Sequence, residues 1–253
     1  MKENKVKTAI KAGLPVVGVI SNSTDPTIAE ICGFAGLDFY MIDGEHCPVT
    51  TSEVQNIVRG CEFAGIIPLA RVRSNDPKLV LQFIDAGIAG VMMPGLFTKK
   101  DVEDFVQSMK YPPFGQRGLG PVRSADFMMG TMNQLDYVNF ANDQTLVLPM
   151  IEDIKALKNL DDMCKVTGVD GFIIGPRDLA MSMGFIDGPA HDEVKAVIDQ
   201  IFEIVKSNGL MIGTVAGNAE QVKALIAKGA GFVMNSVAGL LSASSKDFMK
   251  GKS

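Results

Sequence analysis

Short apolar segments alternate along the chain with longer amphipathic ones. Eight short segments are apolar at nearly every position, at 16–20, 38–42, 67–72, 90–93, 146–151, 169–174, 210–215 and 231–234. Strands that are buried on both faces, as in a parallel sheet, have this near-continuous apolar pattern rather than a strict alternation. We therefore predict eight buried, parallel strands.

The segments between these strands carry apolar residues at helical spacing. Asp76-Pro77 is a typical helix start, with an N-cap followed by proline in the first turn, and Asn208-Gly209 is a typical helix stop. The pattern predicts helices at 27–36, 51–64, 76–86, 192–208, 219–228 and 237–249.

Eight strand–helix repeats in 253 residues predict an α/β protein with a single-domain (β/α)₈ TIM barrel. The main alternative is an open, doubly wound sheet, which typically has fewer strands and often a glycine-rich turn after the first one. Ser21-Asn22-Ser23-Thr24 follows the first predicted strand here, so the dinucleotide-binding fingerprint is missing. The barrel is the favoured fold.

The interval between the fourth and fifth predicted strands is too long for a simple repeat. Residues 111–144 begin with the sequence YPPFGQRGLG, whose prolines and glycines predict a shaped loop. Loops of this length are usually functional or contact another subunit, and a solvated insertion is the alternative. We expect an inserted loop and helix region here.

Composition and charge exclude several classes of protein. The chain is 47% hydrophobic and 21% charged, which argues against disorder, and its net charge of −5 without a long Lys/Arg block argues against a nucleic-acid partner. No apolar run reaches the ~18 residues of a membrane span. The lysine-rich start lacks the apolar core of a signal peptide, and the four cysteines form no C-x-x-C pair. We expect a cytoplasmic protein with no membrane partner.

Charged residues follow four of the predicted strands. In a barrel, catalytic groups lie at the C-terminal ends of the strands. These ends carry Asp43-Gly44-Glu45-His46, then Arg71, then Glu152-Asp153, and finally Gly175-Pro176-Arg177-Asp178. The barrel fold therefore brings acids, arginines and a histidine to one rim.

His46 is one of two histidines in the chain. A lone histidine is often structural, but its place beside two acids at a strand end favours proton transfer, because imidazole titrates near neutral pH. Asp85 follows the third strand on a predicted helix. It is either a surface residue or a partner that orients His46 through a hydrogen bond.

Glu152 and Asp178 follow neighbouring strands and together provide half of an octahedral site for a hard divalent cation. The alternative is that each acid caps the helix after it. Zinc fits less well, because no second histidine or thiolate is suitably placed. Arg71 either holds a carboxylate or an oxyanion of the substrate or makes a structural ion pair.

Taken together, these segments resemble the HpcH/HpaI family of class II pyruvate aldolases, in the phosphoenolpyruvate/pyruvate barrel superfamily. The resemblance covers most of the chain, in order from residue 38 to about 237. It is carried by FYMIDGEHCP, ARVRSNDP, FIDAGIAGVMMP, KYPPFGQRGLG, LPMIEDIKALKNLD, GVDGFIIGPRDLAMSMG and GAGFVMNSV.

The resemblance implies a role for each matching residue. His46 matches the general base, Asp85 the acid that raises its basicity, and Arg71 the arginine that stabilises the enolate. Glu152 and Asp178 match the two ligands of a divalent metal cation, usually Mg²⁺, Mn²⁺ or Co²⁺. Gly175, Pro176, Arg177 and Asp178 match the segment whose backbone N–H groups bind the carboxylate of the keto acid.

The implied reaction is metal-dependent cleavage of a 4-hydroxy-2-oxo acid into pyruvate, or a related 2-oxo acid, and an aldehyde. Two positions depart from the family pattern. Met150 stands where a glutamine is common, and Arg177 where a small residue is common. They leave open the aldehyde half of the substrate and two alternatives: an acyl-CoA lyase of the same superfamily and a non-catalytic barrel that binds keto acids.

The resemblance also implies a homotrimer or homohexamer, in which the last helix is often exchanged between subunits. The predicted helix at 237–249 carries Leu240, Leu241 and Phe248 and suits this role.

Overall fold

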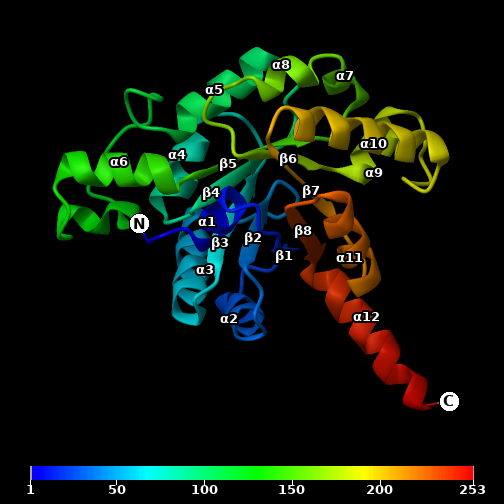
Figure 1. The fold of residues 1–253 in the computed structure, drawn as a ribbon. Coiled ribbons are helices and arrows are strands. Elements are labelled where there is room, and N and C mark those ends of the chain that lie inside the picture. The colour runs from blue at the N-terminus through cyan, green and yellow to red at the C-terminus, as the bar shows by residue number, and fades with distance from the viewer. Residues whose placement is uncertain (1, 253) are drawn as a thin grey trace.

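Eight parallel strands close into a barrel in the computed structural model, which describes residues 2–252 (Figure 1). β8 pairs with β1, with Val16 opposite Phe232 and Ile20 opposite Ser236, so the barrel prediction is confirmed and the open sheet is excluded. The strands are β1 (Val16–Ser21), β2 (Phe39–Gly44), β3 (Ile67–Val72), β4 (Gly90–Met93), β5 (Leu146–Ile151), β6 (Gly171–Ile174), β7 (Met211–Val215) and β8 (Phe232–Ser236).

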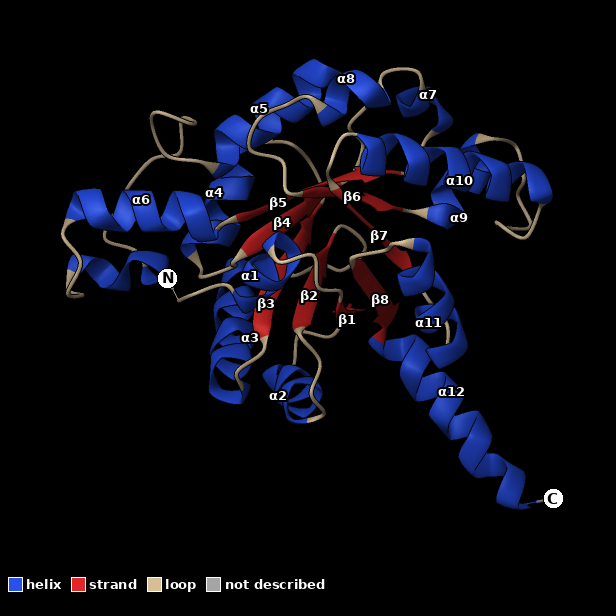
Figure 2. Cartoon of the chain, in the orientation of Figure 1, coloured by secondary structure: helices blue, strands red, loops and turns tan. Residues whose placement is uncertain are grey.

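Helices surround the strands, as Figure 2 shows. None of those between residues 2 and 252 is long and apolar enough to cross a membrane. In chain order they are α1 (Lys5–Lys11), α2 (Pro26–Phe34), α3 (Thr51–Ala64), α4 (Pro77–Asp85), α5 (Lys99–Met109), η1 (Arg123–Met128), α6 (Gln134–Gln144), α7 (Ile154–Leu157), α8 (Leu160–Cys164), α9 (Pro176–Ser182), α10 (Asp192–Ser207), α11 (Ala219–Lys228), α12 (Val237–Met249) and η2 (Lys250–Lys252).

Most predicted boundaries agree with these elements, and one difference matters for function. The second strand does not stop at residue 42 but continues to Gly44, so Asp43 belongs to β2 and not to the loop after it. The predicted strand ended too early because the buried carboxylate of Asp43 interrupts the run of apolar residues. Helices α1, α5, α7, α8 and α9 were not predicted, and α7 and α8 are too short to show a periodic pattern.

Alternate residues of the strands fill the inside of the barrel. Phe39 stacks on Phe232 with their ring centroids 4.1 Å apart, and Met41, Leu69 and Met150 belong to the same buried cluster. The strand residues between them point outward and pack against the helices. Because the side-chain period of a strand is two, the residues two places beyond Met41, Leu69 and Met150 also face inward, at the barrel mouth.

Gly18 in β1 leaves the space that the Phe39 ring occupies. A Cβ atom at position 18 would lie 2.3 Å from the carbonyl oxygen of Phe39 and 2.6 Å from its ring. Only glycine fits there.

Helix α1 closes the N-terminal end of the barrel. Val6 packs into the inner cluster, and the fully buried Asn4 donates from its side-chain amide to the carbonyl oxygens of Ala89 and Gln144. The ammonium of Lys7 is also buried and donates to the carbonyl of Thr145. Asn4 and Lys7 therefore have a structural function that the polar pattern of this segment did not predict.

Residues 111–144 form an insertion with a small core of its own. Tyr111, Ala125, Tyr137 and Ala141 are buried together, and the ammonium of Lys110 donates to the carbonyl oxygens of Asn142 and Thr145. The insertion lies beside α4, at the left in Figure 1.

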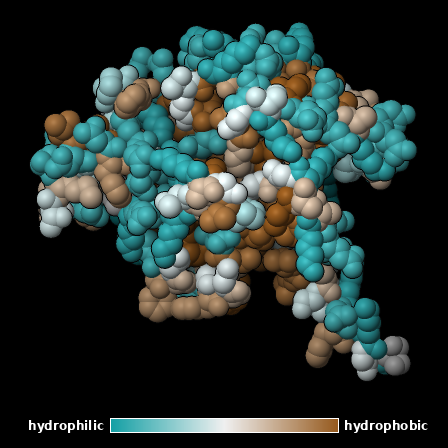
Figure 3. Space-filling model, viewed as in Figure 1, coloured by the Kyte–Doolittle hydropathy of each residue, from teal (hydrophilic) through white to brown (hydrophobic). Residues whose placement is uncertain are grey.

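Helix α12 extends away from the barrel as an arm (Figures 1 and 2). It holds no buried residue among those described, and Leu241 and Phe248 are 67% and 86% exposed. A second apolar surface lies on α2 and α3, where Ile31, Phe34 and Phe63 are exposed. Figure 3 shows hydrophobic atoms near α2, at the lower edge of the molecule, and towards the tip of the arm.

Candidate active site

Asp43 and Arg71 form a buried ion pair at the barrel mouth. They are register partners in β2 and β3, so their inward-facing side chains meet. Nε and Nη2 of Arg71 donate to Oδ1 and Oδ2 of Asp43 at 3.0 and 2.7 Å, and each side chain is only 10% exposed. A two-point contact of this kind fixes the plane of the guanidinium.

Burial by itself would raise the pKa of Asp43. The hydrogen bonds and positive charge of Arg71, with the backbone N–H groups of His46 and Glu45, reverse that effect and hold the pKa below its usual value. Asp43 is therefore a carboxylate at neutral pH and holds Arg71 in place.

Glu45 and His46 follow β2 and turn back over this pair. Their backbone N–H groups both donate to Oδ1 of Asp43, at 3.1 and 3.2 Å. Oε2 of Glu45 lies 3.1 Å from Nη1 of Arg71 and 4.0 Å from Nε2 of His46. The His46 side chain is 64% exposed, so its imidazole is open to a substrate at the mouth.

Glu152 follows β5 and faces the same mouth. Its Oε1 accepts a hydrogen bond from the N–H of Gly95 at 3.0 Å. Burial raises the pKa of Glu152, the Gly95 hydrogen bond lowers it in part, and the negative charges of Glu45 and Asp178 raise it further, so that it lies above its usual value. This carboxylate therefore lacks a full counter-charge.

Gly175 and the first turn of α9 lie next to Glu152. The N–H of Gly175 donates to the carbonyl of Ile151, and a Cβ at position 175 would lie 3.0 Å from Cβ of Glu152. Pro176, Arg177 and Asp178 follow in the first turn of the helix, whose first N–H groups have no partner within the helix. The fold thus brings Asp178 near Glu152, as the strand order predicted.

The chemistry of Glu152 and Asp178 fits a divalent cation. Both offer carboxylate oxygens, the ligands that hard cations prefer, and a cation would supply the counter-charge that Glu152 lacks. Within residues 2–252, no group of three or more His, Cys, Asp or Glu side chains is placed to hold a metal. The remaining ligands would have to be water and substrate oxygens.

Asp85 is paired with a residue of the insertion. It ends α4, the helix that leads back from the mouth toward the start of β4, and its Oδ1 accepts a hydrogen bond from Nη2 of Arg117 at 2.9 Å. Arg117 belongs to the insertion and its side chain is fully buried. Among the described residues no hydrogen bond or ion pair joins Asp85 to His46, and the role of Asp85 beside that imidazole stays a prediction.

Met150 lies below the mouth. It is 4% exposed, and its terminal methyl group is 2.4 Å from the position of a Cβ at Gly175. Arg177, in contrast, is exposed. The first departure from the family pattern therefore changes the floor of the site, and the second changes its rim.

Two residues of the site, Asp43 and Glu45, were not assigned roles from the sequence. The signal was the alternation within β2: Phe39 and Met41 face inward, so Asp43 does too. Glu45 lies outside the strand, and no periodicity places its side chain.

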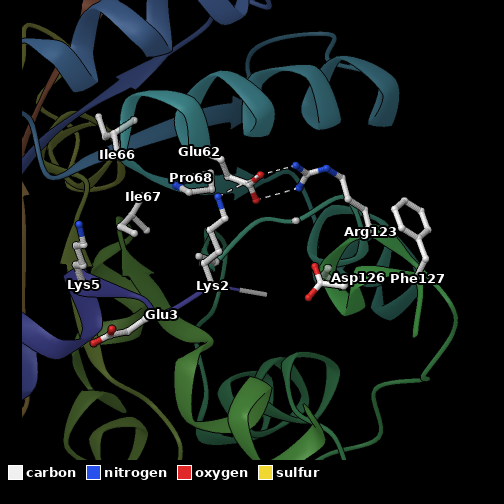
Figure 4. A pocket seen from close by; sticks show the side chains of 14 residues that line it. Lys2, Glu3, Lys5, Glu62, Ile66, Ile67, Pro68, Arg123, Asp126 and Phe127 are labelled. Atoms are coloured by element: carbon white, nitrogen blue, oxygen red, sulfur yellow. Dashed lines mark hydrogen bonds and ion pairs between the residues drawn. The ribbon is translucent and has the colours of Figure 1, made fainter. Parts of the chain in front are cut away.

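A separate cavity of about 460 Å³ lies away from these residues (Figure 4). It is lined by the N-terminal segment, by the start of β3 and by η1, and therefore lies at the opposite end of the barrel. Its Arg123 and Glu62 form an ion pair at 2.6 Å. The polar groups of the mouth remain the candidate active site.

Comparisons with known proteins agree with the fold and assign a family. A sequence model of the HpcH/HpaI aldolase/citrate lyase family matches residues 17–244. The chain is similar to a 4-hydroxy-2-oxo-heptane-1,7-dioate aldolase of Escherichia coli, at 35% identity over 232 residues, 91% of this chain and 87% of that protein. It is also similar to a hydroxypyruvate/pyruvate aldolase of Cupriavidus necator, at 31% identity over 236 residues, 92% and 86% of the two chains.

Among solved structures, the fold is similar to that of an HpcH/HpaI aldolase from Desulfitobacterium hafniense. The TM-score is 0.90 at 31% identity, over 97% of this chain and 96% of that one. The family resemblance found in the sequence is confirmed, and the aldolase names of the relatives favour an enzyme over a non-catalytic barrel. This chain belongs to the HpcH/HpaI aldolase/citrate lyase family and is a carbon–carbon lyase.

Proposed function

We propose that this enzyme is a metal-dependent aldolase that cleaves a 4-hydroxy-2-oxo acid into pyruvate, or a related 2-oxo acid, and an aldehyde. The observation that carries the proposal is the convergence at one mouth of an arginine, an exposed histidine and two acids, of which Glu152 lacks a full counter-charge. The names of the relatives from Escherichia coli and Cupriavidus necator support the same reaction.

Glu152 and Asp178 would hold the metal, with Mg²⁺, Mn²⁺ and Co²⁺ as the candidates. The chemistry that such an ion supplies is Lewis-acid polarisation of the keto group next to the breaking carbon–carbon bond. The N–H groups at the start of α9, around Arg177 and Asp178, would bind the carboxylate of the keto acid.

His46 and Arg71 would act on the substrate itself. His46 takes the proton from the 4-hydroxyl group as the bond between C3 and C4 breaks, directly or through one water. Arg71 places its positive charge beside the oxygen on which negative charge develops. The Asp43 contact keeps the guanidinium from rotating away.

The test is condensation of pyruvate with a panel of aldehydes, before and after treatment with EDTA. We expect activity that EDTA removes and that Mg²⁺, Mn²⁺ or Co²⁺ restores. Glu152→Gln and Asp178→Asn should lose it, and metal should raise the thermal midpoint of the wild type but not that of these variants. Asp162→Asn, at an exposed carboxylate of α8, is the matched control.

Absent or metal-independent activity across the panel would contradict the proposal. Cleavage of malyl-CoA or citramalyl-CoA in its place would assign the enzyme to the acyl-CoA lyases. Met150 and Arg177 bear on the aldehyde, so the panel should compare aldehydes with and without a second carboxylate.

We further propose that the enzyme is a homotrimer or homohexamer in which α12 packs on a neighbouring subunit. The support is the exposure of Leu241 and Phe248 on the arm and of Phe34 and Phe63 on the barrel. Exposed apolar surfaces of this kind often mark protein–protein contacts.

A further inference from the structure

We propose that Glu45 is a positioning residue that holds Arg71 and His46 in a single arrangement for proton transfer. The inference rests on the proposed aldolase function and adds to it a residue that is neither a metal ligand nor the general base. It stands on the contacts that Glu45 makes at the mouth.

The carboxylate of Glu45 contacts both groups through one oxygen. Oε2 lies 3.1 Å from Nη1 of Arg71 and 4.0 Å from Nε2 of His46. Among the residues that the structure describes, it is the one carboxylate within ion-pair distance of both side chains.

Glu45 completes a clamp around the guanidinium. Asp43 binds Nε and Nη2, and Glu45 approaches the remaining nitrogen, Nη1. A guanidinium has five N–H groups, so three contacts leave one on each terminal nitrogen for substrate oxygens. With both acids present, Arg71 keeps one orientation and still has donors to offer.

The same carboxylate compensates charge when His46 takes up a proton. Oε2 of Glu45 is buried, and in the described part of the chain it has ion pairs but no hydrogen-bond partner. A buried carboxylate oxygen of this kind is stable only beside positive charge. An imidazolium at 4.0 Å would place such charge beside this oxygen, so Glu45 is suited to face His46 after proton abstraction.

Glu45 also acts on the metal ligand across the mouth, since its negative charge contributes to the raised pKa of Glu152. Removing that charge therefore changes the candidate metal site as well as the contacts with Arg71 and His46. The kinetic test has to be made at saturating Mn²⁺, with metal affinity measured separately by calorimetry.

The experiment compares Glu45→Gln and Glu45→Asp with the wild type, with Glu193→Gln as the control. Glu193 is an exposed carboxylate in the first turn of α10, at the same end of the barrel. Pyruvate–aldehyde turnover and proton exchange at the pyruvate methyl group are measured between pH 5 and 9, together with thermal unfolding.

We expect Glu45→Gln to lower kcat by about 10- to 100-fold with a smaller change in KM. The acidic limb of its kcat/KM profile should move to lower pH, because an amide no longer favours the protonated imidazole. Glu45→Asp keeps the charge and should show a smaller loss. Glu193→Gln should match the wild type.

A Glu45→Gln enzyme with the kcat and pH profile of the wild type would overturn the inference. If Glu45→Gln does not fold, Glu45→Ala takes its place: wild-type kcat and pH profile in that variant have the same meaning. An inactive wild type would instead contradict the proposed aldolase function, so the two failures are distinguishable.

Discussion

The Asp43–Arg71 pair shows how single residues set the chemistry of the mouth. Each follows two inward-facing apolar residues on its strand, so the barrel interior ends in an ion pair. The pair is buried, and removing Asp43 leaves Glu45, 3.1 Å away, as the remaining counter-charge of Arg71.

Asp43→Asn should cost less than the about 3–5 kcal/mol of stability expected for an unpaired buried charge, because Glu45 still compensates Arg71, measured by urea unfolding. The activity should fall by about 100-fold or more, because the guanidinium is no longer held at two points. Asp162→Asn on the surface should change neither quantity. Wild-type stability in Asp43→Asn would show that the pair is energetically neutral.

The lowered pKa of Asp43 predicts a pH dependence of stability. A carboxylate whose pKa is lower in the folded state stabilises the fold above its unfolded-state value, about 3.9, and loses that effect as the pH falls through the folded-state value. The difference in unfolding free energy between wild type and Asp43→Asn should be constant above about pH 5 and shrink below pH 4. A difference that does not change down to pH 2.5 would contradict the assignment.

At the scale of elements, the junction between β6 and α9 connects the barrel core to the site. Gly175 lies against the terminal methyl group of Met150, which forms the floor of the mouth. It also lies against Glu152, a candidate metal ligand. Movement of α9 and movement of Glu152 are therefore linked.

Gly175→Ala should destabilise the fold by about 1–3 kcal/mol through overpacking and displace Glu152 from its place. Both metal affinity and activity should fall. The double variant Gly175→Ala/Met150→Ala makes room for the new methyl group and should recover part of the stability. Gly118→Ala is the control, since a Cβ atom at position 118 would have no other atom within 4 Å. No rescue in the double variant would mean that Met150 is not the obstacle.

At the scale of the whole molecule, a closed barrel carries two apolar surfaces that the single chain leaves uncovered. One is the arm α12, with Leu241 and Phe248, and the other lies on α2 and α3, with Phe34 and Phe63.

Light scattering should give a trimer or hexamer for the wild type. Leu241→Asp/Phe248→Asp should shift the enzyme to smaller species, because burying two new charges in an apolar contact is unfavourable. Lys246→Gln on the same helix should leave the assembly unchanged. A monomeric wild type would contradict the proposed oligomer.

The sequence by itself determined the barrel and most of its boundaries. Eight apolar runs separated by amphipathic segments are compatible with few other folds, because strands that are buried on both faces need helices between them. It also brought Arg71, Glu152 and Asp178 to one mouth, because the ends of parallel strands lie on one rim.

Only the tertiary structure decided how these groups pair. Asp43 and Arg71 meet through strand register, Glu45 reaches Arg71 and His46 through a loop, and Asp85 turns to Arg117 on the insertion. Each of these contacts joins segments with no shared periodicity, so no pattern along the chain specifies them. Periodicity fixes which face a residue takes, whereas the partner it meets depends on packing between elements.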